Sequence, residues 1–213
     1  GLFNRTTMLP IQIKTIKDFR EFSCKEKASE FIAIVYPVDN EENALTQLNE
    51  IRKKYFDASH HCYAYKLKSG EEKYSDDGEP KGTAGIRILN AIQHFDLSDV
   101  LLVVVRYFGG TKLGVGPLGK AYYNASIEVL NTSEILTKTL FQNILIEVDF
   151  NFVSHVHRVI NHYSAIIADS EYSNIAKFYC FVKPNDFELI NIELSNLTNG
   201  QILIKLLPNQ KYF

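Results

Sequence analysis

Apolar residues in the first half of the chain form short runs that predict alternating strands and helices. Residues 31–38, FIAIVYPV, are a β-rich run that ends near a proline, and residues 39–56 follow with apolar positions at helical spacing. Residues 60–67 alternate between polar and apolar positions as a strand does, and residues 86–95 return to helical spacing. The pattern therefore predicts strand, helix, strand and helix in this order.

The most hydrophobic run lies in the middle of the chain. Residues 99–108, DVLLVVVRYF, are continuously apolar through most of their length, which predicts a strand covered on both faces. Glycine-rich residues 109–120 follow, and residues 121–130 predict a helix that ends near Asn131. No run approaches the roughly 18 apolar residues that a membrane-spanning helix needs.

The pattern changes after about residue 138. The rest of the chain predicts a strand, a helix, two strands, a helix and a strand, over residues 139–150, 151–163, 164–172, 174–182, 185–197 and 201–207. This β-α-β-β-α-β order is typical of a ferredoxin-like domain. We therefore expect an α/β domain followed by an α+β domain.

The expected domain boundaries follow from this change of pattern. They are an N-terminal domain over residues 1–133, a hinge over residues 134–138 and a C-terminal domain over residues 139–213. We expect residues 1–8 to be either an added N-terminal tag or disordered, because Met8 is the single methionine of the chain.

Composition narrows the class of protein. The 23 Lys and Arg residues nearly balance the 25 Asp and Glu residues, so nucleic-acid binding would need a local basic patch. The three cysteines are widely spaced and form no CxxC pair, which argues against a disulfide framework and a zinc site and favours the cytoplasm. Cys62 has no identifiable base nearby in the sequence, and we interpret it as a buried packing residue.

Residues 76–85, DDGEPKGTAG, concentrate carboxylates and glycines in one short segment, which we call the acidic loop. The acids of this loop could bind Mg²⁺ or act as acid and base, joined by two histidines of the preceding strand. The residues concerned are Asp76, Asp77, Glu79, His60 and His61. Neighbouring Asp and His side chains point in divergent directions, which favours a structural turn. No complete catalytic set appears, and we expect no metal and no cofactor.

Residues 114–121, GVGPLGKA, match two phosphate-binding patterns in part. The GxGxxG pattern does not directly follow a strand here, and the acid that a dinucleotide fold places at the end of a second strand is missing. The GxxxxGK pattern has Ala121 where an NTPase needs Ser or Thr for Mg²⁺, and Pro117 removes a backbone N–H from the loop. Both departures argue against a nucleotide site.

Three cations surround the glycines of residues 109–120, which we call the glycine loop: Arg106, Lys112 and Lys120. Backbone N–H groups at the start of a helix attract anions, and nearby cations strengthen the attraction. The alternative is that Arg106 neutralises the acidic loop and holds the two loops together. The sequence leaves both interpretations open.

Three ordered segments, HHCYAY, SDDGEPKGTAG and VVVRYFGGTKLGVGPLGKAYYNA, closely resemble the YigZ/IMPACT family over about residues 20–130. The C-terminal pattern resembles the second domain of the bacterial YigZ-type members. This resemblance implies an N-terminal domain like domain 2 of ribosomal protein S5 and a ferredoxin-like domain like one from elongation factor G.

The resemblance also implies a function. It points to a cytoplasmic, non-enzymatic protein that regulates translation by binding RNA, the ribosome or a translation-associated protein, without a membrane partner. The eukaryotic IMPACT members look like regulators that bind a partner protein but lack the C-terminal domain, so that partner does not transfer to this chain. The alternative is a small-molecule or nucleotide-dependent enzyme that uses the acidic loop with a divalent metal.

The family motif and the charge pattern together indicate a binding surface. Its expected residues come from the strand before the acidic loop, from the acidic loop and from the glycine loop: His60, His61, Asp76, Asp77, Glu79, Thr83, Arg106, Tyr107, Gly109, Gly110, Lys112 and Lys120. The chain departs from the family pattern at Arg87, Pro117 and Lys120, where Pro, Gly and Arg are usual. Lys120 keeps a positive charge but loses the two-pronged geometry of Arg.

Overall fold

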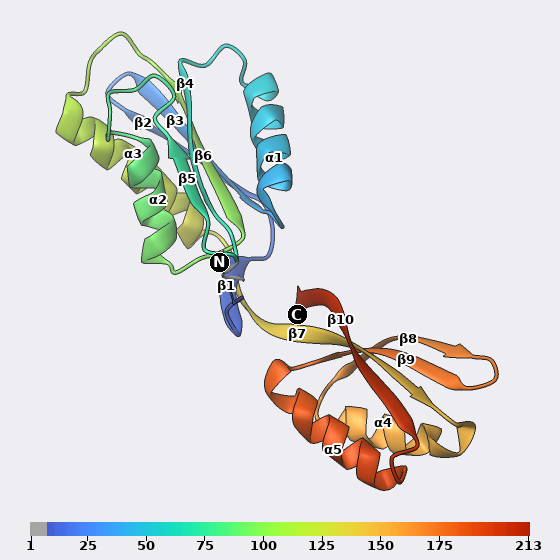
Figure 1. Cartoon of the computed structure of the whole chain (residues 1–213). Helices are drawn as coiled ribbons and strands as arrows, with labels where there is room; N and C mark the ends of the chain where they lie inside the picture. The colour runs from blue at the N-terminus through green and yellow to red at the C-terminus, as the bar shows by residue number, and fades with distance from the viewer. Residues whose placement is uncertain (1–7) are drawn as a thin grey trace, which may run out of the picture. The chain divides into compact units, whose positions relative to one another are not determined.

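A computed structural model describes residues 8–213 of the chain (Figure 1). These residues divide into two units, of which the first ends at Thr137 and the second spans Lys138–Phe213. The expectation about residues 1–8 lies outside the described residues, apart from the exposed Met8. Each unit combines strands with helices, so the chain is a mixed α/β protein of two units. In the described part of the chain, no helix is long and apolar enough to cross a membrane.

A five-stranded antiparallel sheet forms the centre of the first unit. Its strand order is β2-β3-β6-β4-β5. The strands of this unit are β1 (Gln12–Ile16), β2 (Arg20–Glu26), β3 (Ser29–Pro37), β4 (His60–Lys66), β5 (Glu72–Ser75) and β6 (Val100–Tyr107).

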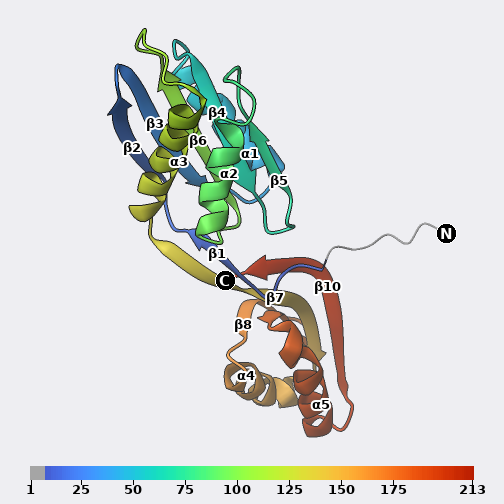
Figure 2. The same cartoon turned by 90° about the vertical axis from the view of Figure 1, so that its left-hand side faces the viewer.

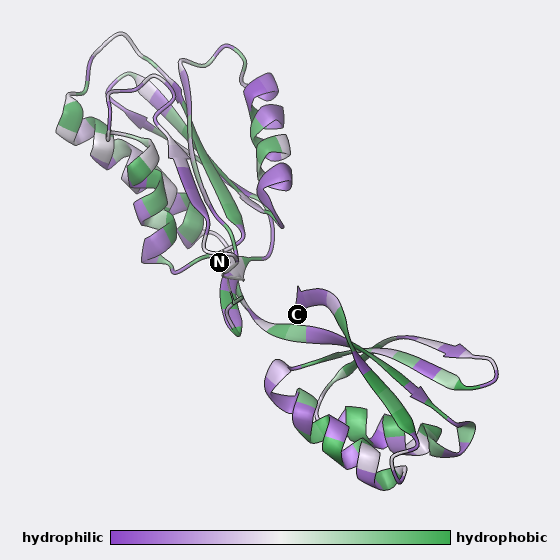
Figure 3. Ribbon diagram, viewed as in Figure 1, coloured by the Kyte–Doolittle hydropathy of each residue, from purple (hydrophilic) through white to green (hydrophobic). Residues whose placement is uncertain are grey.

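Three helices cover the two faces of this sheet. They are α1 (Glu41–Lys54) on one face and α2 (Gly85–His94) and α3 (Val115–Asn131) on the other (Figures 1 and 2). The helix α1 begins after Asn40, whose side chain caps it by accepting a hydrogen bond from the N–H of Asn43 at 2.8 Å. The helix α1 is mostly hydrophilic with apolar residues between (Figure 3), and its buried residues are Ala44, Leu48 and Ile51.

The position of β6 at the centre of the sheet, with helices on both faces, explains its continuous apolar run. Val100, Leu102 and Val104 belong to the core under α2 and α3. The intervening residues Leu101 and Val103 belong to the core under α1. Because strand side chains alternate between faces, a strand with a helix layer on each side is apolar at every position, which confirms the prediction of cover on both faces.

The second unit follows the predicted β-α-β-β-α-β order. Its elements are β7 (Ile135–Val148, which begins in the first unit), α4 (Val153–His162), β8 (Ile166–Tyr172), β9 (Ala176–Val182), α5 (Phe187–Leu197) and β10 (Ile202–Tyr212), with short 3₁₀ turns at Phe150–Phe152 and Pro184–Asp186. The antiparallel strands lie in the order β10-β7-β9-β8. Both helices pack on one face of this sheet around a single apolar core (Figure 1).

Three features differ from the sequence-based expectation. Residues 134–138, expected as a hinge, are largely strand, because β7 already begins at Ile135. The helix α3 begins at Val115 and not near residue 121, because Pro117 lies in its first turn, where a missing N–H breaks no helical hydrogen bond. The strands β1, β2 and β5 were not predicted, because they are short or half exposed and lack an apolar run.

We predict that a fragment of residues 138–213 folds without the first unit. Its core is built from its own strands and helices, and its chain ends are joined, because Thr139 and Phe213 exchange two backbone hydrogen bonds of 2.7 and 3.0 Å. Urea titration followed by circular dichroism should therefore give one cooperative transition. A fragment without a transition, beside a full chain that has one, would place the boundary elsewhere.

Candidate functional site

The acidic loop wraps around the start of α2. One carboxylate oxygen of Asp76 accepts hydrogen bonds from the N–H groups of Ala84 at 3.1 Å and Gly85 at 2.8 Å, and the other accepts from Gly82 at 3.0 Å. Ala84 stands at the N-cap of α2 and offers no capping side chain. Asp76 supplies the missing acceptor and places a negative charge at the positive end of the helix.

The second acid of the loop fastens the start of β4. Asp77 has a positive φ of 41°, and its carboxylate accepts a hydrogen bond from the backbone N–H of His61 at 2.7 Å. The Nδ1 atom of His60 lies 2.8 Å from the carbonyl oxygen of Asp77, and the Nε2 atom of His61 lies 2.7 Å from that of Tyr55. A carbonyl oxygen only accepts, so these two ring nitrogens carry the hydrogens.

The third acid forms a buried ion pair with Arg106. One Oε of Glu79 lies 2.6 Å from a terminal nitrogen of Arg106 and accepts a second hydrogen bond from the Tyr122 hydroxyl at 2.8 Å. The other terminal nitrogen of Arg106 donates to Ser29 Oγ at 3.2 Å. The two charged side chains are 5% and 3% exposed. This geometry gives Arg106 the role of joining the acidic loop to the end of β6.

Cys62 belongs to the same buried network. Its thiol donates to the carbonyl oxygen of Asp76 at 3.0 Å and lies 3.4 Å from the Tyr122 hydroxyl. Burial raises the pKa of the Cys62 thiol far above its usual range and also raises the pKa of the Tyr122 hydroxyl. Cys62 therefore stays protonated, in agreement with its interpretation as a packing residue.

A cavity of about 350 Å³ lies above this ion pair, and we call it the loop cavity. Its lining comes from the acidic loop, from the ends of β4 and β6 and from the glycine loop: His60, Glu79, Pro80, Arg106, Phe108, Lys112, Leu113, Gly114, Val115 and Leu118. Phe108 and Val115 remain 47% and 66% exposed. The start of α3 borders the cavity with Gly114 at the N-cap, at φ 86° and without a capping side chain.

The structure brings some of the expected site residues together and separates others. His60, Glu79, Arg106 and Lys112 share the loop cavity. Tyr107 belongs to the opposite face of the sheet, where its hydroxyl donates to Asp57 at 2.8 Å. Tyr107 was expected on the same surface as Arg106, and the structure places the two side chains on opposite faces of the sheet, because consecutive strand residues alternate.

Other expected residues have positions that their packing explains. Thr83 is buried and donates to the carbonyl oxygen of Pro80. A Cβ atom at Gly109 would lie 1.9 Å from the carbonyl oxygen of Ala28, so no larger residue fits there. Gly110 has a φ of 87°, a conformation that favours glycine.

Lys120 lies on the exposed surface of α3, outside the lining of the loop cavity. Arg87 of α2 approaches the same helix, because its Nε atom lies 3.1 Å from the point that a Cβ at Gly119 would occupy. The two cations therefore lie on the helix layer and not at the cavity floor.

Sequence reasoning missed the apolar rim of the loop cavity. Phe108 and Val115 are large apolar residues beside glycines, and this combination was the available signal for an exposed apolar surface. Ser29 was also missed, because only the pairing of β3 with β6 brings it near Arg106.

The hydrogen bonds of the acidic loop bear on whether its carboxylates could bind Mg²⁺. Asp76 already accepts three backbone hydrogen bonds and Glu79 is paired with Arg106, so neither carboxylate is left to bind Mg²⁺. Among residues 8–213, no group of three or more His, Cys, Asp or Glu side chains is arranged to hold a metal ion.

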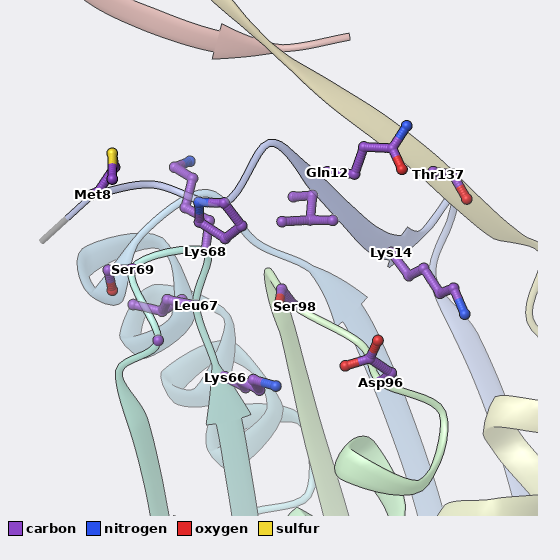
Figure 4. Close-up of a pocket in the computed structure, with 13 residues that line it drawn as sticks. Met8, Gln12, Lys14, Lys66, Leu67, Lys68, Ser69, Asp96, Ser98 and Thr137 are labelled. Carbon is purple, nitrogen blue, oxygen red and sulfur yellow. The ribbon is translucent and has the colours of Figure 1, made fainter.

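A larger cavity of about 540 Å³ lies at the opposite end of β4 and β6 (Figure 4). Lys14, Lys66 and Lys68 line it together with Asp96. The ammonium group of Lys68 is already bound by the Asp39 carbonyl oxygen at 3.0 Å. None of the family-motif residues borders this cavity, and we therefore take the loop cavity as the candidate site.

We predict that Glu79→Ala destabilises the first unit by about 3–5 kcal/mol, because it leaves the buried charge of Arg106 without a partner. The exposed Glu71→Ala serves as the matched control and should change the free energy of unfolding by less than about 0.5 kcal/mol. Urea unfolding measures both.

The paired change Glu79→Leu with Arg106→Met tests whether this loss of stability comes from an uncompensated charge or from lost packing. If an uncompensated charge is responsible, the double variant is more stable than Glu79→Leu alone. A double variant that is less stable would show that packing, and not the charge, dominates.

Comparison with known proteins follows the same division of the chain. Residues 27–130 match the family model described as the Impact N-terminal domain. Residues 146–201 match a domain of unknown function, DUF1949. A crystal structure of a hypothetical protein superposes with a TM-score of 0.69 at 23% sequence identity, covering 94% of this chain and 100% of the other, which shows a shared fold.

Curated relatives extend the match over most of the chain. The IMPACT family member YvyE of Bacillus subtilis is 30% identical over 193 residues, covering 90% of this chain and 89% of that protein. An IMPACT family member of Haemophilus influenzae is 31% identical over 188 residues, covering 85% and 90%. The IMPACT family member YigZ of Escherichia coli is 30% identical over 150 residues, covering 68% and 74%. This chain, with its acidic loop and its glycine loop, belongs to the IMPACT family.

Proposed function

We propose that the chain is a non-enzymatic, cytoplasmic binding protein that regulates translation by contacting RNA, with the loop cavity and the neighbouring start of α3 as its binding surface. The observation that carries the proposal is Lys112, an exposed cation at the border of a cavity that also meets the uncapped start of α3. Free N–H groups and a cation at one place suit a phosphate group.

The apolar part of the loop cavity supports the same ligand. Phe108 and Val115 are exposed beside Lys112, and an aromatic ring next to a cation suits a nucleotide, whose base stacks while its phosphate pairs. Arg106 does not serve as a phosphate ligand in this proposal, because its charge is already neutralised by Glu79.

The cations on α2 and α3 extend the surface along the helices. Lys120 is exposed, and Arg87 approaches α3 at Gly119. Arg87 replaces the proline that is usual in the family, so this chain has an additional positive charge at that point. Pro117 removes one N–H from the start of α3, which leaves Val115 and Gly116 as the donors there.

The fold gives a further reason for a role in translation. We infer that the first unit is like domain 2 of ribosomal protein S5 and that the second unit is ferredoxin-like, like a domain of elongation factor G. The β-α-β-β-α-β order and the strand order β10-β7-β9-β8 support the second assignment.

We predict that the double variant Lys112→Ala and Lys120→Ala binds RNA more weakly while its thermal stability stays nearly unchanged. Each lost phosphate contact should reduce the slope of log affinity against log salt concentration by about 0.7–0.9. Fluorescence anisotropy with a labelled RNA over a series of salt concentrations measures the slope.

The variant Lys53→Ala and Lys54→Ala is the matched control for this experiment. It removes the same charge from α1, which covers the opposite face of the sheet, and it should leave the slope unchanged. Equal slopes in all three proteins would remove the phosphate contact from the proposal. Mg²⁺-dependent hydrolysis of ATP or GTP that is lost in Asp77→Asn would support the enzymatic alternative instead.

A further inference from the structure

The sheet of the second unit has one face that neither of its helices covers, and we call it the open face. Within β9, Ala176, Phe178, Cys180 and Val182 are fully buried in the core under α4 and α5. The residues between them therefore point to the open face, since strand side chains alternate. Those residues are Lys177, Tyr179 and Phe181, and all three are partly exposed.

The strand register extends the open face onto the neighbouring strands, because directly opposite residues share a face. On β7, Glu147, Leu145 and Asn143 lie opposite Lys177, Tyr179 and Phe181 respectively. On β10, Lys205 lies opposite Leu145, and Lys211 lies opposite Phe141. Two central strands thus present a continuous surface with a row of cations beside it.

The sequence of β9 matches in part the pattern that sheet-type RNA-binding domains use to stack bases. That pattern reads Lys or Arg, Gly, an aromatic residue, Gly or Ala, Phe, Val, any residue and a final aromatic residue. Residues 177–184, KFYCFVKP, agree at Lys177, Tyr179, Phe181 and Val182 and disagree at Phe178, Cys180 and Pro184. The three positions that face outward all agree, and in these domains the outward aromatics stack on two or three bases of single-stranded RNA.

Two of the three positions that disagree lie under the sheet, and the third, Pro184, lies beyond the end of β9. Phe178 and Cys180 replace small residues of the pattern, and both are fully buried in the core. They change the packing below the sheet and leave the outward row intact. The pattern is therefore kept at the three outward positions of β9.

Further side chains on this face suit nucleotides. The Phe213 ring lies edge-on to those of Phe141 and Phe181, with 5.2 Å between ring centroids in each case. Lys211 lies 4.8 Å from the Phe213 ring.

The charges of the open face are arranged in rows. Lys205 and Lys211 lie on β10, whereas Asp169 and Glu171 lie on β8, opposite Tyr179 and Lys177. Lys177 is itself paired with Glu147 at 3.5 Å. A polyanion is therefore attracted to the β10 side of the central aromatic residues and repelled from the β8 side.

We propose that the open face binds single-stranded RNA, with Tyr179 and Phe181 stacking on successive bases and with Lys205 and Lys211 contacting phosphates. This site is separate from the loop cavity of the first unit. It goes beyond the function proposed above, because it gives the chain a second RNA contact that reads unpaired bases.

The chain contains no tryptophan, and this makes a direct test possible. The full-length variant Tyr179→Trp keeps an aromatic ring at the central position and introduces a single tryptophan. Titration with a single-stranded RNA of about ten nucleotides should quench its emission to saturation. A duplex of the same sequence should not, because paired bases are not free to stack. Single-stranded DNA of the same sequence should bind more weakly, since it lacks the ribose hydroxyl.

Substitution without an aromatic ring supplies the affinity measurement. Tyr179→Leu should weaken binding of the single-stranded RNA about 5- to 150-fold, which corresponds to one stacked base. Tyr179→Trp should bind as the original chain does. The matched control is Tyr172→Leu on β8, because Tyr172 lies opposite the core residue Ala176 and so faces away from the open face. It should bind RNA normally.

Two further comparisons make failure of this proposal distinct from failure of the proposed function. Tryptophan quenching should persist when Lys112→Ala and Lys120→Ala are added to Tyr179→Trp.

Unchanged affinity in Tyr179→Leu, or no quenching by saturating RNA, would overturn the open-face site, whether or not the loop cavity binds RNA. A blue shift of the emission with rising protein concentration and no RNA would assign the face to self-association, and equal binding of DNA would overturn the assignment to RNA.

Discussion

The buried ion pair between Glu79 and Arg106 is the interaction on which the candidate site of the first unit depends. Removing two charges from water is costly, and hydrogen bonds with Tyr122 and Ser29 offset part of this cost. Those partners come from α3 and from the start of β3. One charge pair thus fixes the acidic loop, the end of β6, a helix and a strand relative to each other, and it forms the floor of the loop cavity.

Each of the three acids of the acidic loop has its own structural role, and the composition of the loop alone does not distinguish these roles. Asp76 completes the start of α2, Asp77 holds the start of β4, and Glu79 neutralises Arg106. Each carboxylate is thereby used within the fold. The acids are therefore not the exposed part of this surface, which consists of Lys112, Phe108 and Val115.

The sequence predicted the elements that carry strong periodic signals and failed where the signal depends on tertiary contacts. The cover of β6 on both faces was predicted correctly, because it follows from strand alternation. The edge strand β5, EKYS, has no apolar alternation and was missed. The partner of Arg106 could not be chosen among three acids, since the path of a glycine-containing loop is not set by its own residues. The separation of Tyr107 from Arg106 could have been predicted, because it follows from strand alternation alone.

The packing of the glycines changes how sequence variation in this family should be interpreted. Gly109 leaves no room for a side chain against Ala28, so selection for folding alone would preserve it in any relative with this turn. Gly116 is different: it has open space around its Cβ position and no positive φ. Alanine is therefore compatible with the fold at residue 116, and a glycine maintained there across many species would record the approach of a ligand to the backbone of α3.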